Sequence, residues 1–225
     1  MNIKHELRKY CYIYLHGFAS SPKSIKAKFF VDQFKKYDIE VLVPDLNQDD
    51  FYNLTLTRQI NQVKQIIASI NKPVVLIGAS MGGFISVVMA ELEPKIVKNI
   101  LFAPAFNIAN LWDRDYNKHK INDWCKKQTL TVFHYGEKKE LQLHYNFYLD
   151  LLNYKNNKLS KSTHTLIYHG TLDDVVPIEF SKEYIKTNPN ARLVELEDDH
   201  GVSAFLDVIL PQIISFITEN QIINE

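Results

Sequence analysis

The sequence contains few cysteines: two among its 225 residues, Cys11 and Cys125. Cys11 lies in an apolar, strand-like run, whereas Cys125 lies in a polar run that is rich in lysine. This pair does not form the dense, regularly spaced framework of a small disulfide-stabilised domain. We therefore expect both side chains to be free thiols, and neither to take part in the chemistry.

The chain also lacks an excess of charge of either sign. Its 26 lysine and arginine residues balance 26 aspartate and glutamate residues, and both signs are scattered along its length. A nucleic-acid-binding protein would gather its basic residues on one face. We therefore expect no nucleic acid partner.

Long hydrophobic runs are absent as well. No stretch approaches the roughly 18 consecutive apolar residues that are needed to cross a bilayer. The first twenty residues carry His5, Glu6, Arg8 and Lys9, and no cleavable apolar region follows them. We therefore expect no membrane span and a cytoplasmic location.

What the sequence does contain is a regular alternation of short apolar runs and helical patterns. This alternation predicts βαβ units and a parallel sheet. Several of the runs are apolar at nearly every position, which is typical of strands that helices cover on both faces. The predicted strands are 11–15, 40–43, 73–77, 99–102, 165–168 and 193–196, and the predicted helices are 24–36, 56–70, 82–91, 178–186 and 204–218.

The fold class that follows is α/β, with a doubly wound, mostly parallel sheet of about six to seven strands. We expect one domain over residues 1–225, because single α/β domains of roughly 200–250 residues bury about 70–75% of their unfolded surface. Residues 106–162 interrupt the alternation and are rich in lysine, asparagine, tyrosine and histidine. An insertion of this kind is either a lid over the sheet edge or a surface excursion, and we favour the lid.

The strongest local signal is the run PVVLIGASMGGF at residues 73–84, where a strand-like stretch leads into G-x-S-x-G and an apolar helical pattern follows. A serine on such a sharp turn is held above the sheet in a strained backbone conformation. Small residues two positions before and after it avoid collisions with the neighbouring strand and helix, and Gly78 and Gly82 meet this need. The run therefore predicts Ser80 as a nucleophile.

A serine hydroxyl needs a base, and the base needs a group that orients it. His200 lies in the loop after the last predicted strand, while Asp173 and Asp174 follow the strand before it. Because the loops after parallel strands meet at one sheet edge, we expect these groups to lie close to the serine. His200 is the predicted base, and either of these two aspartates could orient it. Asp198 and Asp199, which precede His200, are better suited to capping its loop.

The first predicted strand ends in His16, Gly17 and Phe18. Gly17 allows the chain to turn back, so that the amide of Phe18 can face the amide of Met81. Two fixed N–H dipoles would then meet the negative charge that develops when the serine attacks a carbonyl. His16 and His169 each precede a glycine but lack metal-ligand spacing, so we expect structural hydrogen bonds from them. We expect neither a metal nor a cofactor.

Four motifs, spread in order over nearly the whole chain, resemble the α/β-hydrolase superfamily: LHGF at 15–18, GASMGG at 78–83, HGTLDDVVP at 169–177 and DDHG at 198–201. The opening LHGFASSPKSIKAKFF is similar to small bacterial esterases of the YqiA/YcfP type and to ABHD-type acyl esterases and thioesterases. The resemblance implies an α/β-hydrolase fold. It also implies that Ser80, Asp173 and His200 are catalytic, and that Phe18 and Met81 supply the oxyanion-hole amides. It selects Asp173 because the acid of such families is usually the fifth residue of the HGTLD stretch.

The function that this resemblance implies is that of a serine hydrolase, a carboxylesterase or thioesterase that cleaves small to medium acyl esters through an acyl-enzyme intermediate. Its partner would be a small-molecule acyl ester or thioester. Phe106, Trp112 and Trp124 fit the core of a small lid, and one or two of them would line an acyl pocket if the insertion is a lid. The alternatives are a peptidase or amidase, an acyltransferase, and a catalytically silent scaffold that acts as a binding module.

Overall fold

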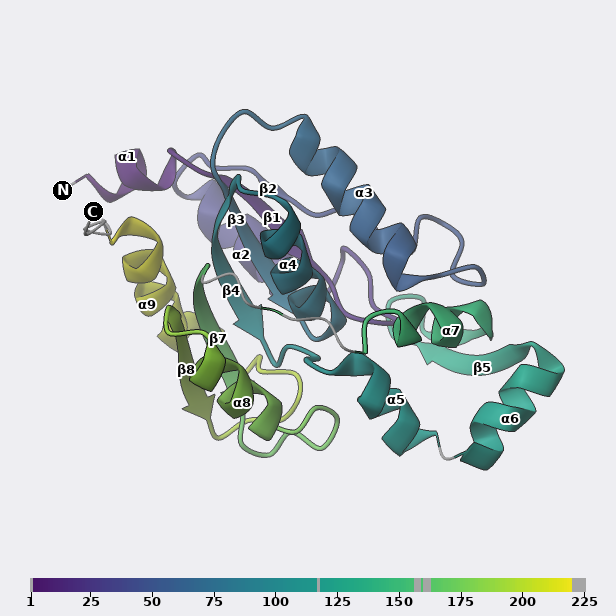
Figure 1. Cartoon of the computed structure of the whole chain (residues 1–225). Coiled ribbons are helices and arrows are strands. Elements are labelled where there is room, and N and C mark those ends of the chain that lie inside the picture. The colour runs from purple at the N-terminus through teal and green to yellow at the C-terminus, as the bar shows by residue number, and fades with distance from the viewer. Residues whose placement is uncertain (1, 117, 156–158, 160–162, 220–225) are drawn as a thin grey trace.

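The computed structural model describes residues 2–116, 118–155, 159 and 163–219 (Figure 1). Its large sheet has six strands in the order β2-β1-β3-β4-β7-β8, and each pairing within it is parallel. The predicted parallel sheet with helices on both faces is confirmed. Its strands are β1 (Cys11–Leu15), β2 (Val41–Leu42), β3 (Val74–Ala79), β4 (Ile96–Phe102), β7 (His164–Gly170) and β8 (Ala191–Leu196).

The central strands present apolar side chains to both faces of this sheet. Tyr12 and Tyr14 of β1 belong to one buried cluster, whereas Ile13 and Leu15 belong to the other. Successive side chains of a strand point to opposite sides, so each face receives its own hydrophobic core. The helices of the first face are α2 (Ile25–Lys35) and α9 (Leu206–Thr218), and those of the second are α3 (Leu56–Ala68), α4 (Met81–Leu92) and α8 (Glu179–Thr187).

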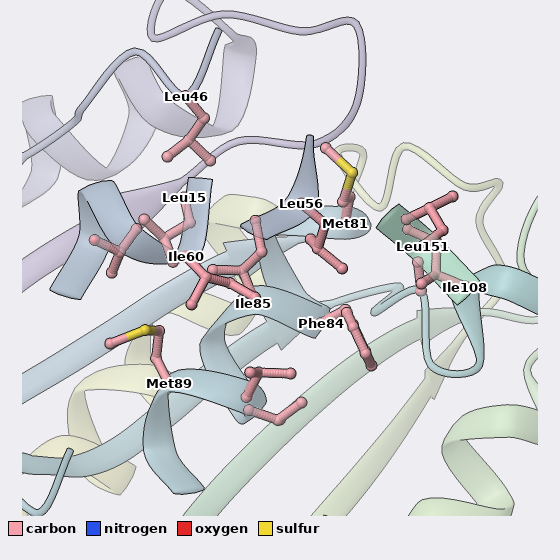
Figure 2. Close-up of a cluster of buried hydrophobic side chains, with 14 of the residues drawn as sticks. Leu15, Leu46, Leu56, Ile60, Met81, Phe84, Ile85, Met89, Ile108 and Leu151 are labelled. Carbon is pink, nitrogen blue, oxygen red and sulfur yellow. The ribbon is translucent and has the colours of Figure 1, made fainter. Parts of the chain in front are cut away.

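Helix α4 is buried along most of its length. The ten residues from Met81 to Ala90 are all buried. Figure 2 shows Phe84 and Ile85 of this helix among Leu15 of β1, Ile60 of α3 and other apolar side chains. The helix is apolar almost all round because the sheet covers one side of it and other helices cover the other side. The apolar helical pattern that follows the G-x-S-x-G run is therefore a buried helix.

Before β1, the structure has a short helix that the sequence does not predict, α1 (Ile3–Leu7). The side chain of Asn2 caps its first turn by accepting from the amide of His5. Leu7 is its buried residue, and it packs in the cluster that contains α2 and α9. One buried side chain in five residues leaves too little periodicity for a helix to be recognised.

The predicted insertion at 106–162 folds into helices and a two-stranded antiparallel hairpin. Residues 117, 156–158 and 160–162 of that prediction lie outside the described residues. Trp124 is buried within the segment, and its Nε1 donates to the carbonyl of Leu143 at 3.2 Å. The elements are α5 (Ile108–Asp115), α6 (Lys118–Lys127), β5 (Thr129–His134), β6 (Lys139–His144) and α7 (Asn146–Leu152).

The insertion is attached to loops at one edge of the large sheet. In Figure 1, α5, α6, α7 and β5 lie together to the right of that sheet. The amide of His144 donates to the carbonyl of Tyr52 at 2.9 Å. The Thr57 hydroxyl, in the first turn of α3, donates to Asp150 at 2.6 Å. Tyr52 and Thr57 follow β2, so the insertion lies at the carboxyl edge of the sheet.

Cys11 and Cys125 are both free thiols, as expected. Within the described ranges, we find no helix of sufficient length and apolarity to cross a membrane.

Candidate active site

The loops after β1, β3 and β8 meet at one edge of the large sheet. The strands are parallel, so their carboxyl ends lie at the same edge. Ser80 directly follows β3, and His200 lies in the loop after β8. Both residues line a cavity of about 380 Å³, together with Gly17 and Phe18 of the loop after β1. The structure thus brings the predicted nucleophile and the predicted base to a single cavity.

Ser80 has a strained backbone. Its φ of 51° and ψ of −118° lie in a region that residues other than glycine rarely adopt. Its amide donates to the carbonyl of Phe102 at 2.9 Å, and its carbonyl accepts from the amides of Gly83, Phe84 and Ala105 at 2.9, 3.1 and 3.0 Å. These four hydrogen bonds hold the conformation. Ser80 is the N-cap of α4, but its side chain makes no capping hydrogen bond, so the hydroxyl is available for chemistry.

The glycines that flank Ser80 lie where a side chain would collide with its neighbours. A Cβ on Gly78 would lie 2.4 Å from Oγ of Ser86 and 2.5 Å from the carbonyl oxygen of Gly82. A Cβ on Gly82 would lie 2.1 Å from the carbonyl oxygen of Leu15, at the end of β1. Glycine at position 82 therefore lets α4 approach the backbone of β1.

Replacing Gly82 by alanine is expected to destabilise the protein by about 2–3 kcal/mol, because backbone of β1 must move to make room. Gly201→Ala is a matched control. The atom nearest to a Cβ on Gly201 is the carboxylate oxygen Oδ1 of Asp199, at 2.8 Å, and this side chain can shift. Urea unfolding gives both free energies of unfolding. An equal loss in the two variants would contradict the steric argument.

Asp173 and His200 are in direct contact. Nδ1 of His200 lies 2.8 Å from Oδ2 of Asp173. The Asp173 side chain is 1% exposed and that of His200 is 25% exposed. An ionised carboxylate can only accept, so Nδ1 donates and carries a proton. Nε2 of His200 is then the ring nitrogen that can accept a proton.

His169 is a second imidazole beside Asp173. Its Nε2 lies 3.1 Å from Oδ2 of Asp173 and 2.9 Å from the carbonyl oxygen of Val176, so this nitrogen carries the proton. Its Nδ1 then accepts from the hydroxyl of Ser181 at 2.8 Å. Burial alone would raise the pKa of Asp173, but the hydrogen bonds from His169 and His200 outweigh it and hold that pKa well below its usual range. Asp173 is therefore an anion between two imidazoles.

The other aspartates of this edge do not contact the imidazole of His200 in a hydrogen bond or ion pair that joins described residues. Asp174 is exposed, and the carboxylate that pairs with His200 is that of Asp173. Asp198 and Asp199 accept hydrogen bonds from backbone amides of the loop that carries His200, at 2.6 to 3.1 Å. The prediction that these two residues cap the loop is confirmed.

The loop after β1 lies directly against Ser80. A Cβ on Gly17 would lie 3.3 Å from Cβ of Ser80 and 3.9 Å from its Oγ. Among the described residues, the amides of Phe18 and Met81 donate to no acceptor of the protein. Unpaired backbone amides are rare inside proteins. These two therefore remain available to an anion near the serine.

The side chain of His16 stabilises the loop after β1 through two hydrogen bonds. It is fully buried, and its Nε2 accepts from the amide of Leu46 at 3.0 Å, so its Nδ1 carries the proton and donates to the carbonyl of Gly17 at 2.9 Å. The structural hydrogen bonds predicted for His16 and His169 are thus confirmed. In the part of the chain that the structure describes, no group of three histidine, cysteine or acidic side chains could hold a metal ion.

The aromatic residues considered for the substrate pocket lie elsewhere. Phe106 stacks on a tyrosine of α8, with ring centroids 4.3 Å apart. Trp124 is buried in the core of the insertion. Trp112 packs edge-on against Phe18, with centroids 5.3 Å apart, and so supports the loop after β1. None of the three is among the described residues that line the cavity.

Lys26 and Tyr135 are among the residues of the cavity wall that the sequence does not single out. Lys26 lies in the first turn of α2, on a helical pattern whose lysines are normally solvated. Tyr135 follows β5 in the hairpin of the insertion, and it is 73% exposed. Lys26 stands in the LHGFASSPKSIKAKFF stretch and Tyr135 stands in no motif, but only the packing of α2 and of the hairpin places them at the cavity.

Solved structures share the fold. Est1E from Butyrivibrio proteoclasticus has a TM-score of 0.72 and 18% identity, over 93% of this chain and 88% of that chain. Alpha/beta hydrolase domain-containing protein 10 from mouse has a TM-score of 0.74 and 18% identity, over 91% of this chain and 86% of that chain. The fold is that of the α/β hydrolases, as the resemblance implies.

A relative in sequence is "Putative esterase/lipase 2" of Mycoplasma genitalium. It is 24% identical over 228 residues, which cover 89% of this chain and 85% of that protein. One family model matches residues 11–218, from the first residue of β1 to the last residue of α9. The match includes the loops after β1, β3, β7 and β8, which carry the residues of the candidate site, and the chain belongs to the family described as Uncharacterised protein family (UPF0227).

Proposed function

We propose that the chain is a serine hydrolase that cleaves carboxylic esters or thioesters through an acyl-enzyme intermediate. The observation that carries the proposal is the 2.8 Å contact between His200 and the buried Asp173, at the cavity that His200 shares with Ser80. A serine hydroxyl is a weak nucleophile, and an imidazole that a carboxylate orients makes it reactive. A binding module has no need of all three groups, which weighs against a silent scaffold.

The first half of the proposed reaction acylates the enzyme. Oγ of Ser80 attacks the carbonyl carbon while Nε2 of His200 takes its proton. Asp173 keeps the other proton on Nδ1 and stabilises the imidazolium. The intermediate then collapses, His200 gives the proton to the leaving alcohol or thiol, and the acyl group stays on Ser80. In the second half, water repeats the attack with the same base, and the acid is released.

The amides of Phe18 and Met81 are the proposed donors to the oxyanion. Two observations support this role: neither amide has a protein acceptor among the described residues, and Gly17 lies against Ser80. The Met81 amide also stands at the start of α4, where the helix dipole favours negative charge. Loss of one such donor typically raises the reaction barrier by about 3–4 kcal/mol.

The size of the cavity favours a small to medium acyl part. Its volume of about 380 Å³ lies at the lower end of the range typical of small-molecule sites, roughly 300–1,000 Å³. Phe18 and Phe102 give its wall an apolar character. The esterase/lipase name of the Mycoplasma genitalium relative supports the choice of an ester as substrate.

We further propose that residues 1–225 form one domain in which the insertion is the lid. Tyr135 of the insertion lines the cavity of Ser80 and His200. The amide of the next residue, Gly136, donates to the carbonyl of Ala19 in the loop after β1 at 3.4 Å. These contacts support the proposal that the hairpin forms part of the cavity wall. Such a wall would help to exclude water from the acyl-enzyme.

The proposal is tested with substrates that differ only in the scissile bond: 4-nitrophenyl esters of increasing acyl length, the matched thioesters and the matched anilides. We expect turnover of the esters and thioesters. Their kcat/KM should rise about fourfold per added methylene, from ~0.8 kcal/mol per buried CH₂, until the acyl chain exceeds the cavity. Faster cleavage of the anilides would instead identify an amidase, and transfer to an added alcohol would identify an acyltransferase. Absence of turnover on every substrate would favour the silent scaffold.

A further inference from the structure

The cavity of Ser80 and His200 contains an ammonium group that the proposed mechanism does not use. Among the described residues that line this cavity, Lys26 is the only lysine or arginine, and none is an aspartate or a glutamate. The first turn of α2 supplies Lys26 together with the cap residue Ser24. A cleft lined by charge of one sign concentrates ligands of the opposite sign.

The ammonium of Lys26 contacts neutral groups. Its Nζ donates to the carbonyl of Gly201, the residue after His200. It also lies 5.9 Å from the centroid of the Phe102 ring. Within the described ranges, no carboxylate forms an ion pair with this ammonium.

Burial also changes the pKa of this lysine. It lowers the pKa of Lys26 to about 8, and the negative charges of Asp198, Asp199 and Asp173 offset this effect only in part. The ammonium form therefore predominates at neutral pH, but it lacks the stabilisation that a close anion would supply.

The position of Lys26 in its helix is not explained by helix stability. The N-terminal end of a helix carries a partial positive charge, which disfavours a lysine in the first turn. Lys98 is the contrasting case: its buried Nζ donates to the carbonyls of Phe216 and Ile217, both at 2.7 Å, near the C-terminal end of α9. The C-terminal end of α9 favours a cation. At the cavity of Ser80, by contrast, the charge of Lys26 and the N-terminal end of α2 both favour an anion.

We propose that Lys26 binds a carboxylate of the substrate, so that the preferred esters or thioesters are anionic close to the scissile carbonyl. This inference rests on the function proposed above and narrows its substrate class. A carboxylate at Nζ would make a charge-assisted hydrogen bond, which is stronger than the bond that Lys26 makes to a neutral carbonyl. Lys26 would then act on binding and not on the bond-breaking chemistry of Ser80.

Two pairs of matched esters test the proposal and separate the two sides of the ester. The first pair, 4-nitrophenyl hemiadipate and 4-nitrophenyl hexanoate, places the carboxylate on the acyl side. The second pair, 4-carboxyphenyl butyrate and 4-carbamoylphenyl butyrate, places it on the leaving group. The variants are Lys26→Met, which removes the charge, and Lys26→Arg, which keeps it. Lys28→Met removes an exposed lysine of the same helix and is the control.

We expect wild-type protein to prefer the anionic ester in at least one pair. Lys26→Met should lower kcat/KM for that ester by about tenfold or more relative to its neutral partner, as expected for a lost hydrogen bond to a charged group. Lys26→Arg should retain the preference, and Lys28→Met should match the wild type. Thermal unfolding of each variant shows whether a change in activity comes from a change in the fold.

An equal loss for both esters of each pair would overturn the inference, because Lys26 would then only hold the loop of His200. Wild-type protein that prefers neither anionic ester would overturn it as well. In both cases hydrolysis of the neutral esters leaves the proposed function standing. Failure of wild-type protein to hydrolyse any of the four esters would overturn the proposed function and this inference together.

The preference for the anionic over the neutral ester should depend on pH. A lysine with a purely structural role would not produce this dependence. The ratio of the two kcat/KM values cancels the titration of the groups that act on both esters alike. In wild-type protein it should fall as the pH rises through about 8, because Lys26 loses its charge, and in Lys26→Met it should stay flat. A flat wild-type ratio would overturn the inference. The other titratable side chains that face Lys26 are Tyr14, Tyr135, Asp173, Asp198, Asp199 and His200.

Discussion

Ser80→Ala is expected to lower kcat for ester hydrolysis by roughly 10⁴-fold or more and to leave the fold intact. The variant removes the hydroxyl that forms the acyl-enzyme. It keeps the oxyanion amides, and they can sustain only a small residual rate above that of water. The hydroxyl makes no capping bond to α4, so its loss removes no hydrogen bond from the helix. The rate is measured on the best 4-nitrophenyl ester, with thermal unfolding recorded on the same sample.

Ser203→Ala is the matched control for this experiment. Ser203 lines the same cavity and is exposed. We expect its variant to keep activity within a few-fold of the wild type. A Ser80→Ala variant that keeps more than about a hundredth of the wild-type rate would mean that another group is the nucleophile.

Asp173→Asn is expected to lower kcat by about 10³–10⁴-fold. The amide nitrogen of an asparagine donates where the carboxylate accepts, so it favours the wrong tautomer of His200. It also removes the negative charge that stabilises the imidazolium. The change is small for the backbone, because an asparagine oxygen can still accept from the amides of Val175 and Val176, as Oδ1 of Asp173 does at 2.9 and 2.8 Å.

Asp174→Asn supplies the comparison for that variant. Asp174 is exposed, and we expect its substitution to change kcat by less than about threefold, as for a surface position. Both rates are measured at the pH optimum, together with the melting temperature of each variant. A severe loss in Asp174→Asn with a mild one in Asp173→Asn would reverse the assignment of the acid.

The fold could be predicted from the sequence wherever burial leaves a clear pattern. Residues 74–79 of β3 are all buried, and the matching run of apolar residues predicts a strand covered on both faces. The strand β2 and the helix α1 give weaker patterns, because β2 has only two residues and α1 has a single buried one. Their extent depends on contacts with distant parts of the chain, which local sequence does not contain.

In the candidate site, too, some residues can be found from the local sequence, whereas others are placed there only by the packing of distant segments. Ser80 and His200 could be chosen because each stands in a loop after a predicted strand, and the parallel sheet brings those loops to one edge. Asp173 and Asp174 share such a loop, and it is the resemblance to the α/β hydrolases that selects Asp173. The second contact of Asp173, with His169, arises only when the intervening loop folds back. The position of Lys26 in the cavity arises only from the packing of α2 against the sheet.

The central claim is that Ser80 is a nucleophile activated by His200 and held in reach of a carbonyl. The most direct measurement is the reaction of folded wild-type protein with a fluorophosphonate, followed by peptide mass spectrometry, with Ser80→Ala and His200→Gln treated alongside. We expect one adduct on Ser80 of the wild type, none in Ser80→Ala and greatly slowed labelling in His200→Gln. Folded wild-type protein that forms no adduct, or forms it at equal rate without the imidazole, would contradict the account.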